Sequence, residues 1–341
     1  MAVALSDVVA SNQRIDSTFP HGLVAVFVGA TSGIGEYTLK ALAKYATKPR
    51  AYIVGRSQDA ADRIIRECKQ SNPSGTFEFI KADVSVLKTV DDVCRQIKSK
   101  ETAINILFES QGTMAFDKKT SDGLPLASAL ILHSRMRFIL NLLPLLQNAQ
   151  SLRRVVSVGA ATCEGPIDMD NMLAQNVPLM QWRNQIASIE TLLLEEAMRR
   201  APDVSFIHDV PGVVKSGIQR EAKGLRMTIL IAISRLLAPL IETPPLESGE
   251  RHLFLATSAR YPPGRNEAAV AGVSLHRSLV LARGTLGREG SGVYSLGAKC
   301  ESAPAKVETL LAEFRESGTA QKVWDSVADD FKKITGTEVA P

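Results

Sequence analysis

Short, nearly continuous apolar runs alternate along the chain with longer segments whose apolar residues recur at helical spacing. The first run covers residues 23–28, and the segment after it places Leu39, Leu42 and Ala46 on one helix face. An unbroken apolar run of this length is typical of a strand covered by helices on both sides. Similar runs recur at residues 51–57, 77–85, 104–112, 153–165, 205–217 and 291–296. The pattern predicts an α/β fold with a doubly wound parallel sheet.

Three glycines lie between the first predicted strand and the helix that follows it. Gly29 lets the chain turn off the strand, Gly33 leaves no side chain between the backbone and a pyrophosphate, and Gly35 lets the helix lie close to the sheet. The N–H groups of the first helical turn then face an anion with the positive end of the helix dipole. Strand, turn and helix together predict a dinucleotide site, whereas glycines alone would also fit a tight turn without a ligand.

The glycine spacing GxxxGIG, over residues 29–35, resembles the phosphate-binding turn of short-chain dehydrogenases/reductases (SDRs). The resemblance covers residues 22–261 and implies a Rossmann-like fold. A lead-in at 1–21 would precede this domain, and a C-terminal helical extension at 262–341 would complete the sheet and cap the substrate side. The resemblance also implies nucleotide contacts by Gly29, Thr31, Ser32, Gly33, Ile34 and Gly35 in the turn, Asp83 and Val84 beside the adenine, and Gly112, Pro211, Gly212 and Ser216 beside the nicotinamide and phosphates.

The end of the second predicted strand indicates which dinucleotide fits. NAD-specific sites usually place a carboxylate there for the ribose 2′-OH, whereas this chain has Arg56 followed by Ser57. Because a guanidinium can pair with a 2′-phosphate, NADP(H) is the expected cofactor. The alternative is that Arg56 is only a solvated charge at a strand end.

The residues that carry SDR redox chemistry are replaced in this chain. The family uses a tyrosine and a lysine one helical turn apart, so that the lysine lowers the pKa of the phenol that exchanges a proton with the substrate. The interval between Lys119 and Lys215 should contain this helix, and it has no tyrosine or lysine. Since general acid–base groups typically contribute about 10²–10⁴ in rate, hydride transfer by the usual route should be slow. In our alignment the four expected catalytic positions hold Ile131, Ala160, Met180 or Gln181, and Asn184 or Gln185.

Glu109 stands at the end of the fourth predicted strand, where the family has an asparagine. A carboxylate at a buried strand end is costly unless it is protonated or paired. A raised pKa would make Glu109 a candidate acid or base. A structural ion pair with Arg135 or Arg137 is the alternative.

Two further residues are candidates for catalysis. Glu164 lies in the segment that should cross the substrate mouth, and the alternative is a solvated loop carboxylate. His133 lies on the predicted central helix, with a packing role as the alternative. His208 and Asp209 are expected to be buried structural groups rather than catalysts.

Composition narrows the functional classes. The 341 residues carry a net charge of +4, which is too small to indicate nucleic-acid binding. The four cysteines have no metal-binding or redox spacing, so no metal site is predicted, and a cytoplasmic location is expected. No secretory signal or transmembrane span is predicted. The apolar stretch 227–241 is interpreted as a substrate lid, with an oligomer contact or a peripheral membrane helix as alternatives, and the predicted helix 126–147 is expected to form a homodimer interface.

The chain as a whole resembles an atypical SDR group that is common in filamentous fungi and often encoded among natural-product pathways. Our first hypothesis is an enzyme of secondary metabolism that binds NADP(H) but performs a non-redox step on a hydrophobic small molecule, such as a cyclisation, isomerisation or dehydration. The second is an NADPH-dependent carbonyl reductase with a non-standard proton donor. The third is a non-catalytic, NADP-binding pseudoenzyme.

Overall fold

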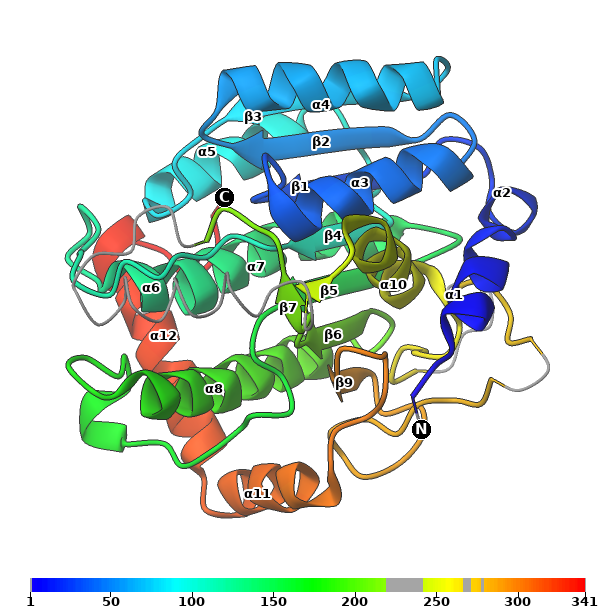
Figure 1. Ribbon diagram of the computed structural model, residues 1–341. Helices are drawn as coiled ribbons and strands as arrows, with labels where there is room; N and C mark the ends of the chain where they lie inside the picture. Colours follow the sequence, from blue (N-terminus) through cyan, green and yellow to red (C-terminus); the bar gives the residue numbers. More distant parts are fainter. Residues whose placement is uncertain (1, 219–241, 266–270, 277–278, 341) are drawn as a thin grey trace.

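A seven-stranded parallel sheet forms the centre of the computed structural model, which describes residues 2–218, 242–265, 271–276 and 279–340 (Figure 1). The strand order is β3-β2-β1-β4-β5-β6-β9, and every neighbouring pair is parallel. All seven predicted strands are present: β1 (Val24–Val28), β2 (Arg50–Gly55), β3 (Thr76–Lys81), β4 (Ile106–Glu109), β5 (Arg154–Val158), β6 (Ser205–Asp209) and β9 (Val293–Leu296). The predicted α/β fold with a doubly wound sheet is confirmed.

Helices cover both faces of the sheet, and each face has its own apolar core. Successive residues of a strand point to opposite faces, so Ala25 and Phe27 of β1 enter one core and Val26 and Val28 the other. The first core is covered by α1 (Leu5–Asn12), α3 (Gly33–Tyr45), α4 (Gln58–Ser71) and α10 (Pro245–Thr257). The second is covered by α5 (Leu87–Lys98), α7 (Arg135–Asn148) and α8 (Leu179–Arg200).

The N-terminal segment belongs to the first of these cores. Helix α1 packs against α10, and α2 (Ile15–Thr18) follows it. Asn12 Nδ2 donates to Glu250 Oε2 at 2.7 Å, and Val3 N donates to Lys299 O at 2.8 Å. The N-terminal segment and the domain that the prediction divides at residue 21 therefore pack directly against each other.

The predicted central helix is a continuous helical stretch with a π-helical segment inside it. Helix α6 (Leu126–Ser128) leads into the π segment (Ala129–Ser134) and then into α7. Such π segments occur often at functional sites. Among the described residues, this stretch is the one helix long and apolar enough to cross a membrane, but 83% of its most apolar window is buried inside the protein. Such burial is expected of a helix that packs on the second face of the sheet.

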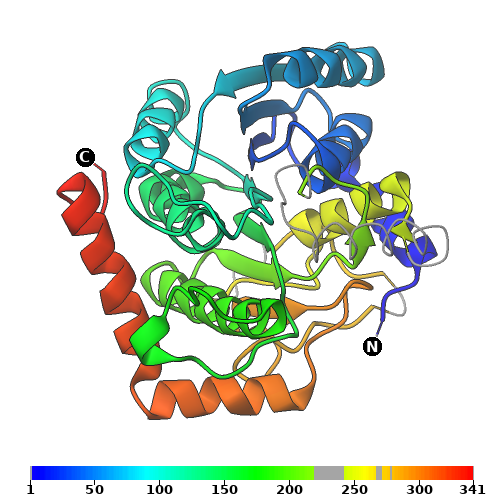
Figure 2. The ribbon, with the colours of Figure 1, turned by 60° about the vertical axis from the view of Figure 1, so that its left-hand side comes forward.

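The C-terminal part adds the last strand and two helices, as predicted. Strand β9 pairs with β6, and α11 (Ala305–Glu316) and α12 (Thr319–Thr335) follow it. Helix α12 packs on α8, α5 and the π segment, and Figure 2 shows it along the outside of the molecule. A homodimer through residues 126–147 stays a prediction, and its interface would have to include or displace α12.

A buried ion pair fixes the segment after α12 to the helices of the second face. Arg137 Nε and Nη2 donate to the two carboxylate oxygens of Asp91 at 2.6 and 2.8 Å, and Asn141 Nδ2 donates to Asp91 at 2.8 Å. Arg137 Nη1 donates to the carbonyl oxygens of Thr337 and Glu338 at 2.8 and 2.6 Å. Because the Arg137 side chain has no exposed surface, all of these contacts are shielded from water.

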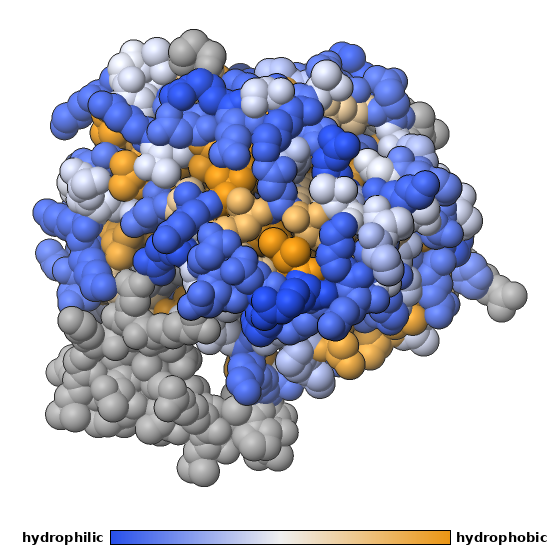
Figure 3. All heavy atoms as spheres, turned by 90° about the horizontal axis from the view of Figure 1, so that it is seen from above, coloured by the Kyte–Doolittle hydropathy of each residue, from blue (hydrophilic) through white to orange (hydrophobic). Residues whose placement is uncertain are grey.

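The sheet edge formed by β3 is polar. On the side where Figure 1 shows α4 and β3, hydrophilic side chains cover most of the surface and leave apolar patches between them (Figure 3). Strand β3 itself exposes Thr76 and Lys81. Polar and charged side chains on an edge strand oppose pairing with the sheet of another molecule.

Candidate active site

The turn between β1 and α3 has the geometry that the sequence predicts. Gly29 has a φ of +82° and Gly33 a φ of +64°, and residues other than glycine rarely adopt this backbone conformation. A Cβ on Gly29 would lie 2.6 Å from Gln111 N, and a Cβ on Gly35 would lie 2.8 Å from Ala30 Cα. The close approach of these backbones therefore requires glycine independently of any ligand.

The N-cap side chain of α3 does not accept a hydrogen bond from the N–H groups of the first helical turn, which can therefore bind another acceptor. Ser32 is the N-cap residue, and its side chain makes no capping hydrogen bond. The acidic residue of this turn, Glu36, accepts hydrogen bonds from Arg63 at 2.8 and 2.9 Å. Burial alone would raise the pKa of Glu36, but hydrogen bonds from Arg63 and a neighbouring lysine lower it overall. The turn thus fits a pyrophosphate, and three of its predicted contact residues are half-buried: Thr31, Ser32 and Ile34.

The other predicted cofactor residues follow the carboxyl ends of the strands. Arg56 is exposed directly after β2, and Ser57 Oγ caps α4 by accepting from Ala60 N at 3.3 Å. Asp83 Oδ1 accepts from Ser85 N and Oγ at 3.1 and 2.8 Å. Ser57 and Asp83 therefore have local structural contacts of their own. The remaining predicted residues are the buried Val84, the half-buried Gly112 and Pro211, and the exposed Gly212 and Ser216.

Residues 213–218, which we call the crossing segment, extend from the end of β6 to the phosphate turn. Tyr37 Oη donates to Lys215 O at 2.9 Å. A Cβ on Gly33 would lie 2.7 Å from Ser216 Cβ. The crossing segment therefore touches the turn where a pyrophosphate is expected.

Glu109 is fully buried at the end of β4 and forms no ion pair within the described part of the chain. The two arginines expected to pair with it, Arg135 and Arg137, bind other carboxylates. Gln111 Nε2 lies 3.5 Å from Glu109 Oε1, and Oε2 has no hydrogen-bond partner among the described residues. Burial raises the pKa of Glu109 well above its usual value, although Arg135 acts in the opposite direction. Of the two alternatives, the structure supports the raised pKa.

His133 is held by the C-terminal helix. Its Nε2 lies 2.9 Å from Asp330 Oδ2, and its ring packs edge-on against Phe331. Both partners belong to α12. These contacts support the packing alternative, and the structure does not bring His133 together with the other two candidates.

Glu164 is buried rather than solvated. Its Oε1 accepts hydrogen bonds from Thr191 Oγ1 at 2.9 Å and from Ser295 Oγ at 2.7 Å. Its side chain has no exposed surface. The alternative of a solvated loop carboxylate is therefore wrong, because α8 and β9 enclose the segment after β5.

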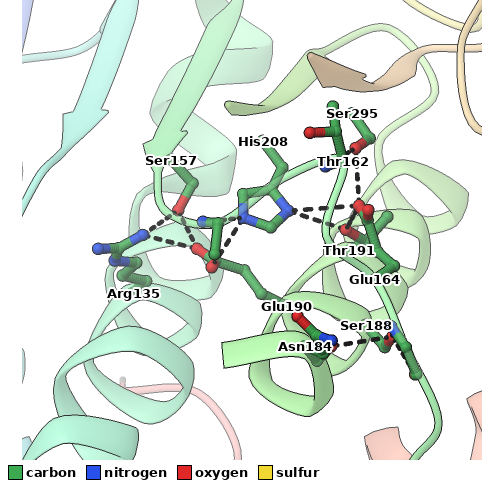
Figure 4. A network of polar contacts seen from close by, with 12 residues as sticks. Arg135, Ser157, Thr162, Glu164, Asn184, Ser188, Glu190, Thr191, His208 and Ser295 are labelled. Carbon is green, nitrogen blue, oxygen red and sulfur yellow. Dashed lines mark hydrogen bonds and ion pairs between the residues drawn. The ribbon is translucent and has the colours of Figure 1, made fainter. Parts of the chain in front are cut away.

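A buried network of polar side chains lies at the carboxyl ends of β5 and β6 (Figure 4). Arg135 Nη1 donates to Glu190 Oε1 at 2.6 Å and to Ser157 Oγ at 2.9 Å. Glu190 Oε2 lies 3.1 Å from His208 Nε2, and His208 Nδ1 lies 2.8 Å from Thr191 Oγ1. We define the buried network by six residues: Arg135, Ser157, Glu164, Glu190, Thr191 and His208.

Two pKa shifts in opposite directions favour the charged forms of Glu190 and His208. Burial opposes the ionisation of Glu190, but Arg135 and His208 lower its pKa overall to about 2. Burial also disfavours the imidazolium of His208, but Glu190 raises its pKa overall. Ala160 N also points its hydrogen at His208 Nε2, at 3.2 Å; when Nε2 is protonated, its own hydrogen is donated to Glu190 Oε2 at 3.1 Å.

Sequence reasoning missed Glu190 and treated His208 as structural. One signal was present: Ile186, Glu190, Leu193 and Ala197 share one face of α8, and a carboxylate among buried apolar residues requires a partner. The helix pattern does not say which residue that partner is. The pairing with Arg135 and His208 follows only from the way the sheet places β5 and β6 beside α7 and α8.

The start of α8 contributes apolar and amide side chains at the positions where our sequence alignment places the family's tyrosine and lysine. Gln185 Nε2 donates to Asn171 O at 2.7 Å, and Met180 is 58% exposed. The rings of Phe116 and Trp182 meet edge-on with centroids 4.9 Å apart. Among the described residues, no group of three or more His, Cys, Asp or Glu side chains is placed to hold a metal ion. We call the half-exposed or exposed residues Phe116, Met180, Trp182 and Ile218 the apolar mouth.

Comparisons with known proteins agree with this geometry. The family model described as short chain dehydrogenase matches residues 23–159. Oxidoreductase AN1596 of Emericella nidulans is 38% identical over 329 residues, which cover 95% of this chain and 96% of that protein. Short-chain dehydrogenase/reductase SAT2 of Stachybotrys chartarum is 29% identical and covers 92% of this chain and 94% of its own.

A solved structure extends the comparison to three dimensions. The structure of L-sorbose reductase from Gluconobacter frateurii, complexed with NADPH and L-sorbose, has a TM-score of 0.53 and 17% identity, and covers 77% of this chain and 98% of its own. At this identity the likeness shows the fold alone. The fungal relatives span nearly the whole chain. The chain therefore belongs to the short-chain dehydrogenase/reductase superfamily.

Proposed function

We propose that this protein is an NADP(H)-dependent oxidoreductase that reduces a carbonyl group, or oxidises the matching alcohol, in a hydrophobic small molecule of fungal secondary metabolism. The buried network is the observation that carries the proposal. It supplies ionisable groups, Glu190 and His208, at the carboxyl ends of β5 and β6, where the phenol and ammonium of the family are absent. The non-redox hypothesis rested on the missing tyrosine and lysine, and because Glu190 and His208 are further ionisable groups, the reductase hypothesis gains most from the buried network.

The phosphate turn and its surroundings support NADP(H) as the cofactor. The left-handed glycines and the uncapped N-terminus of α3 fit a pyrophosphate, and the exposed Arg56 supplies a positive charge for a 2′-phosphate. L-sorbose reductase, which has the same fold, was solved in complex with NADPH. When bound, the nicotinamide would supply or accept a hydride. The residues of this chain would bind the phosphates and handle the proton.

The apolar mouth supports a hydrophobic substrate. Phe116 and Trp182 form an aromatic pair at the start of α8. Met180 is 58% exposed and Ile218 is 44% exposed, so both add apolar surface beside this pair. Trp182 Nε1 donates to Ser128 Oγ at 3.2 Å, which fixes the orientation of the indole ring. Exposed apolar side chains gathered beside buried polar groups are typical of small-molecule sites.

Arg135 supplies a permanent positive charge to the site. Its guanidinium donates to Gln111 O at 2.8 Å after β4 and to Ser157 Oγ after its strand partner β5, so it bridges the ends of two adjacent strands. A fixed charge in a water-excluded site stabilises negative charge that develops on a substrate oxygen, and the loss of one such donor typically costs about 10²–10³ in kcat. Glu109, whose pKa is raised by burial, is a candidate proton donor at the same edge.

Oxidation of NADPH by the purified protein, followed by nicotinamide absorbance with a panel of hydrophobic ketones and aldehydes, tests the proposal. We expect the NADPH consumed to equal the alcohol formed. Gly33→Ala should weaken NADPH binding, because a Cβ at this left-handed position meets Ser216. Product formed without any NADPH consumption would overturn the proposal.

A non-redox step is the second candidate, and Glu109 is the observation that favours it. A buried carboxyl group with a raised pKa can act as an acid toward an alkene or a leaving hydroxyl without a hydride. This candidate predicts a product isomeric with its substrate or lacking one water, with unchanged NADPH and reduced turnover in Glu109→Gln. A pseudoenzyme would bind NADPH and show neither reaction.

Location and assembly stay predictions. We propose a cytoplasmic protein that acts on a small molecule and does not bind nucleic acid, in keeping with its net charge of +4. The stretch 227–241 lies outside the described residues. Its role as a lid, an oligomer contact or a peripheral membrane helix is therefore carried by the sequence alone.

A further inference from the structure

One carboxylate oxygen of the buried network has no partner. Glu164 Oε1 accepts two hydrogen bonds, whereas Oε2 is buried and has no partner among the described residues. Glu164 follows β5 in the segment that leads across the carboxyl edge to α8. Because an unpaired buried polar atom is costly, such an oxygen at this edge indicates a place for the polar group of a ligand.

Behind Glu164 the contacts form a continuous line (Figure 4). Thr191 Oγ1 donates to Glu164 Oε1 at 2.9 Å and accepts from His208 Nδ1 at 2.8 Å. His208 Nε2 then donates to Glu190 Oε2 at 3.1 Å. His208 Nδ1 lies 4.0 Å from Glu164 Oε1, too far for a direct hydrogen bond. The Thr191 hydroxyl is therefore the link between the imidazolium and Glu164.

We propose that Glu164 exchanges a proton with the substrate through Oε2, and that Thr191, His208 and Glu190 form a relay that supplies this proton. The inference rests on the proposed function in one respect, which is that a substrate oxygen needs a proton. Glu164 is the group that would touch the substrate, and because its side chain has no exposed surface, the residues around it have to move to admit the substrate. The other three act through it as positioning residues.

Each transfer in the relay breaks one bond to hydrogen and forms one. In the direction of reduction, the proton on Glu164 Oε2 moves to the substrate oxygen as the proton of Thr191 moves to Glu164 Oε1. The Nδ1 proton of His208 replaces the one that Thr191 has given up. His208 ends as neutral imidazole with its remaining proton on Nε2, facing Glu190. After product release, rotation of the Glu164 carboxyl group brings its new proton to the substrate side, and a proton from solvent restores the imidazolium.

The charges around His208 keep it ready to donate. The charged or titratable groups that face it are Glu190 from α8, Glu164 from the segment after β5, and Arg135 from α7. Glu190 contacts the ring directly, and Arg135 holds Glu190 in place at 2.6 Å. In agreement with this geometry, the pKa of His208 is raised although burial acts against the imidazolium.

Thr191→Val, compared with Ser295→Ala, tests the relay. Both substitutions remove one hydrogen bond to Glu164 Oε1, but only Thr191 leads on to His208. In protein labelled with ¹⁵N-histidine, with His208→Asn assigning the signal, we expect Thr191→Val to slow exchange of the His208 Nδ1 proton with water by about tenfold or more. Ser295→Ala should stay within about twofold of the unmodified protein. Loss of a positioned acid–base path should lower kcat by about 10² in Thr191→Val alone.

The pH profile of activity in Glu190→Gln is a second measurement. If Glu190 had a purely structural role, the substitution would not shift this profile. Loss of the carboxylate should lower the pKa of His208. The decline of activity with rising pH should therefore begin at a lower pH in this variant than in the unmodified protein. Unchanged exchange in Thr191→Val, or equal slowing in Ser295→Ala, would overturn the relay. If the exchange results hold but no carbonyl compound consumes NADPH, the proposed function fails and the relay stands for another proton transfer.

Discussion

Replacing Asp91 by asparagine tests how strongly the buried pair between α5 and α7 holds the fold. The substitution keeps the shape of the side chain but removes the negative charge that faces Arg137, whose side chain has no exposed surface. Breaking a buried pair by removing one partner typically costs about 3–5 kcal/mol, because the other charge is left uncompensated. Arg137 keeps its contacts with the carbonyl oxygens of Thr337 and Glu338, so we expect the lower part of this range.

The neighbouring residue provides a matched control. Asp92 lies on the same helix and pairs with Arg95 at 2.8 Å, but the two side chains are 67% and 57% exposed. An exposed pair of this kind contributes about 0–1 kcal/mol. Asp91→Asn and Asp92→Asn remove the same charge from adjacent positions, so the difference between them isolates the effect of burial.

Thermal unfolding followed by circular dichroism measures the difference. With an unfolding entropy of about 2.1 cal/mol/K per residue, this chain has roughly 0.7 kcal/mol/K, so a loss of 3–5 kcal/mol lowers Tm by about 4–7 °C. Asp92→Asn should lower Tm by no more than about 1–2 °C. The double variant Asp91→Asn with Arg137→Met should recover part of the loss, since no charge is then left buried. Equal Tm values for the two single variants would refute the reasoning.

Three further predictions concern the site. Gly33→Ala should raise the Kd for NADPH measured by fluorescence titration, whereas Gly123→Ala should not, because Gly123 shares the left-handed φ but nothing lies within 4 Å of its added Cβ. The raised pKa of His208 should add stability that is full below about pH 6.5 and lost as the pH rises through the folded-state value, and chemical unfolding of Glu190→Gln should lack this loss. Phe116→Ala should raise KM for hydrophobic substrates more than it lowers kcat.

The sequence predicted the sheet because each parallel strand had to be apolar on both faces. Runs such as residues 23–28 and 205–207 show this pattern directly. The phosphate turn was equally accessible, since Gly29 and Gly33 hold backbone conformations that other residues rarely adopt. Several predicted runs extended well past the strands: the runs 153–165 and 205–217 continue beyond β5 and β6, which end at Val158 and Asp209, because the residues that follow belong to the loops.

The buried network could not be predicted in the same way, because its members come from α7, β5, the segment after β5, α8 and β6. One alternative drawn from the sequence paired Glu109 with Arg135 or Arg137, yet Arg135 pairs with Glu190. Both carboxylates lie close enough to influence Arg135, and only the relative placement of α7 and α8 decides between them. A pattern along one element shows that a polar residue needs a partner, but the choice of partner is a property of the assembled sheet.

The position of β9 has a consequence for how this protein is made. Strand β6 borders β5 on one side and β9 on the other, and β9 follows it only after more than eighty intervening residues. During translation the nascent chain therefore presents β6 as an open edge while the ribosome still holds β9, α11 and α12. Molecular chaperones that bind exposed strands would meet this protein at that stage, before β9 closes the sheet beside His208.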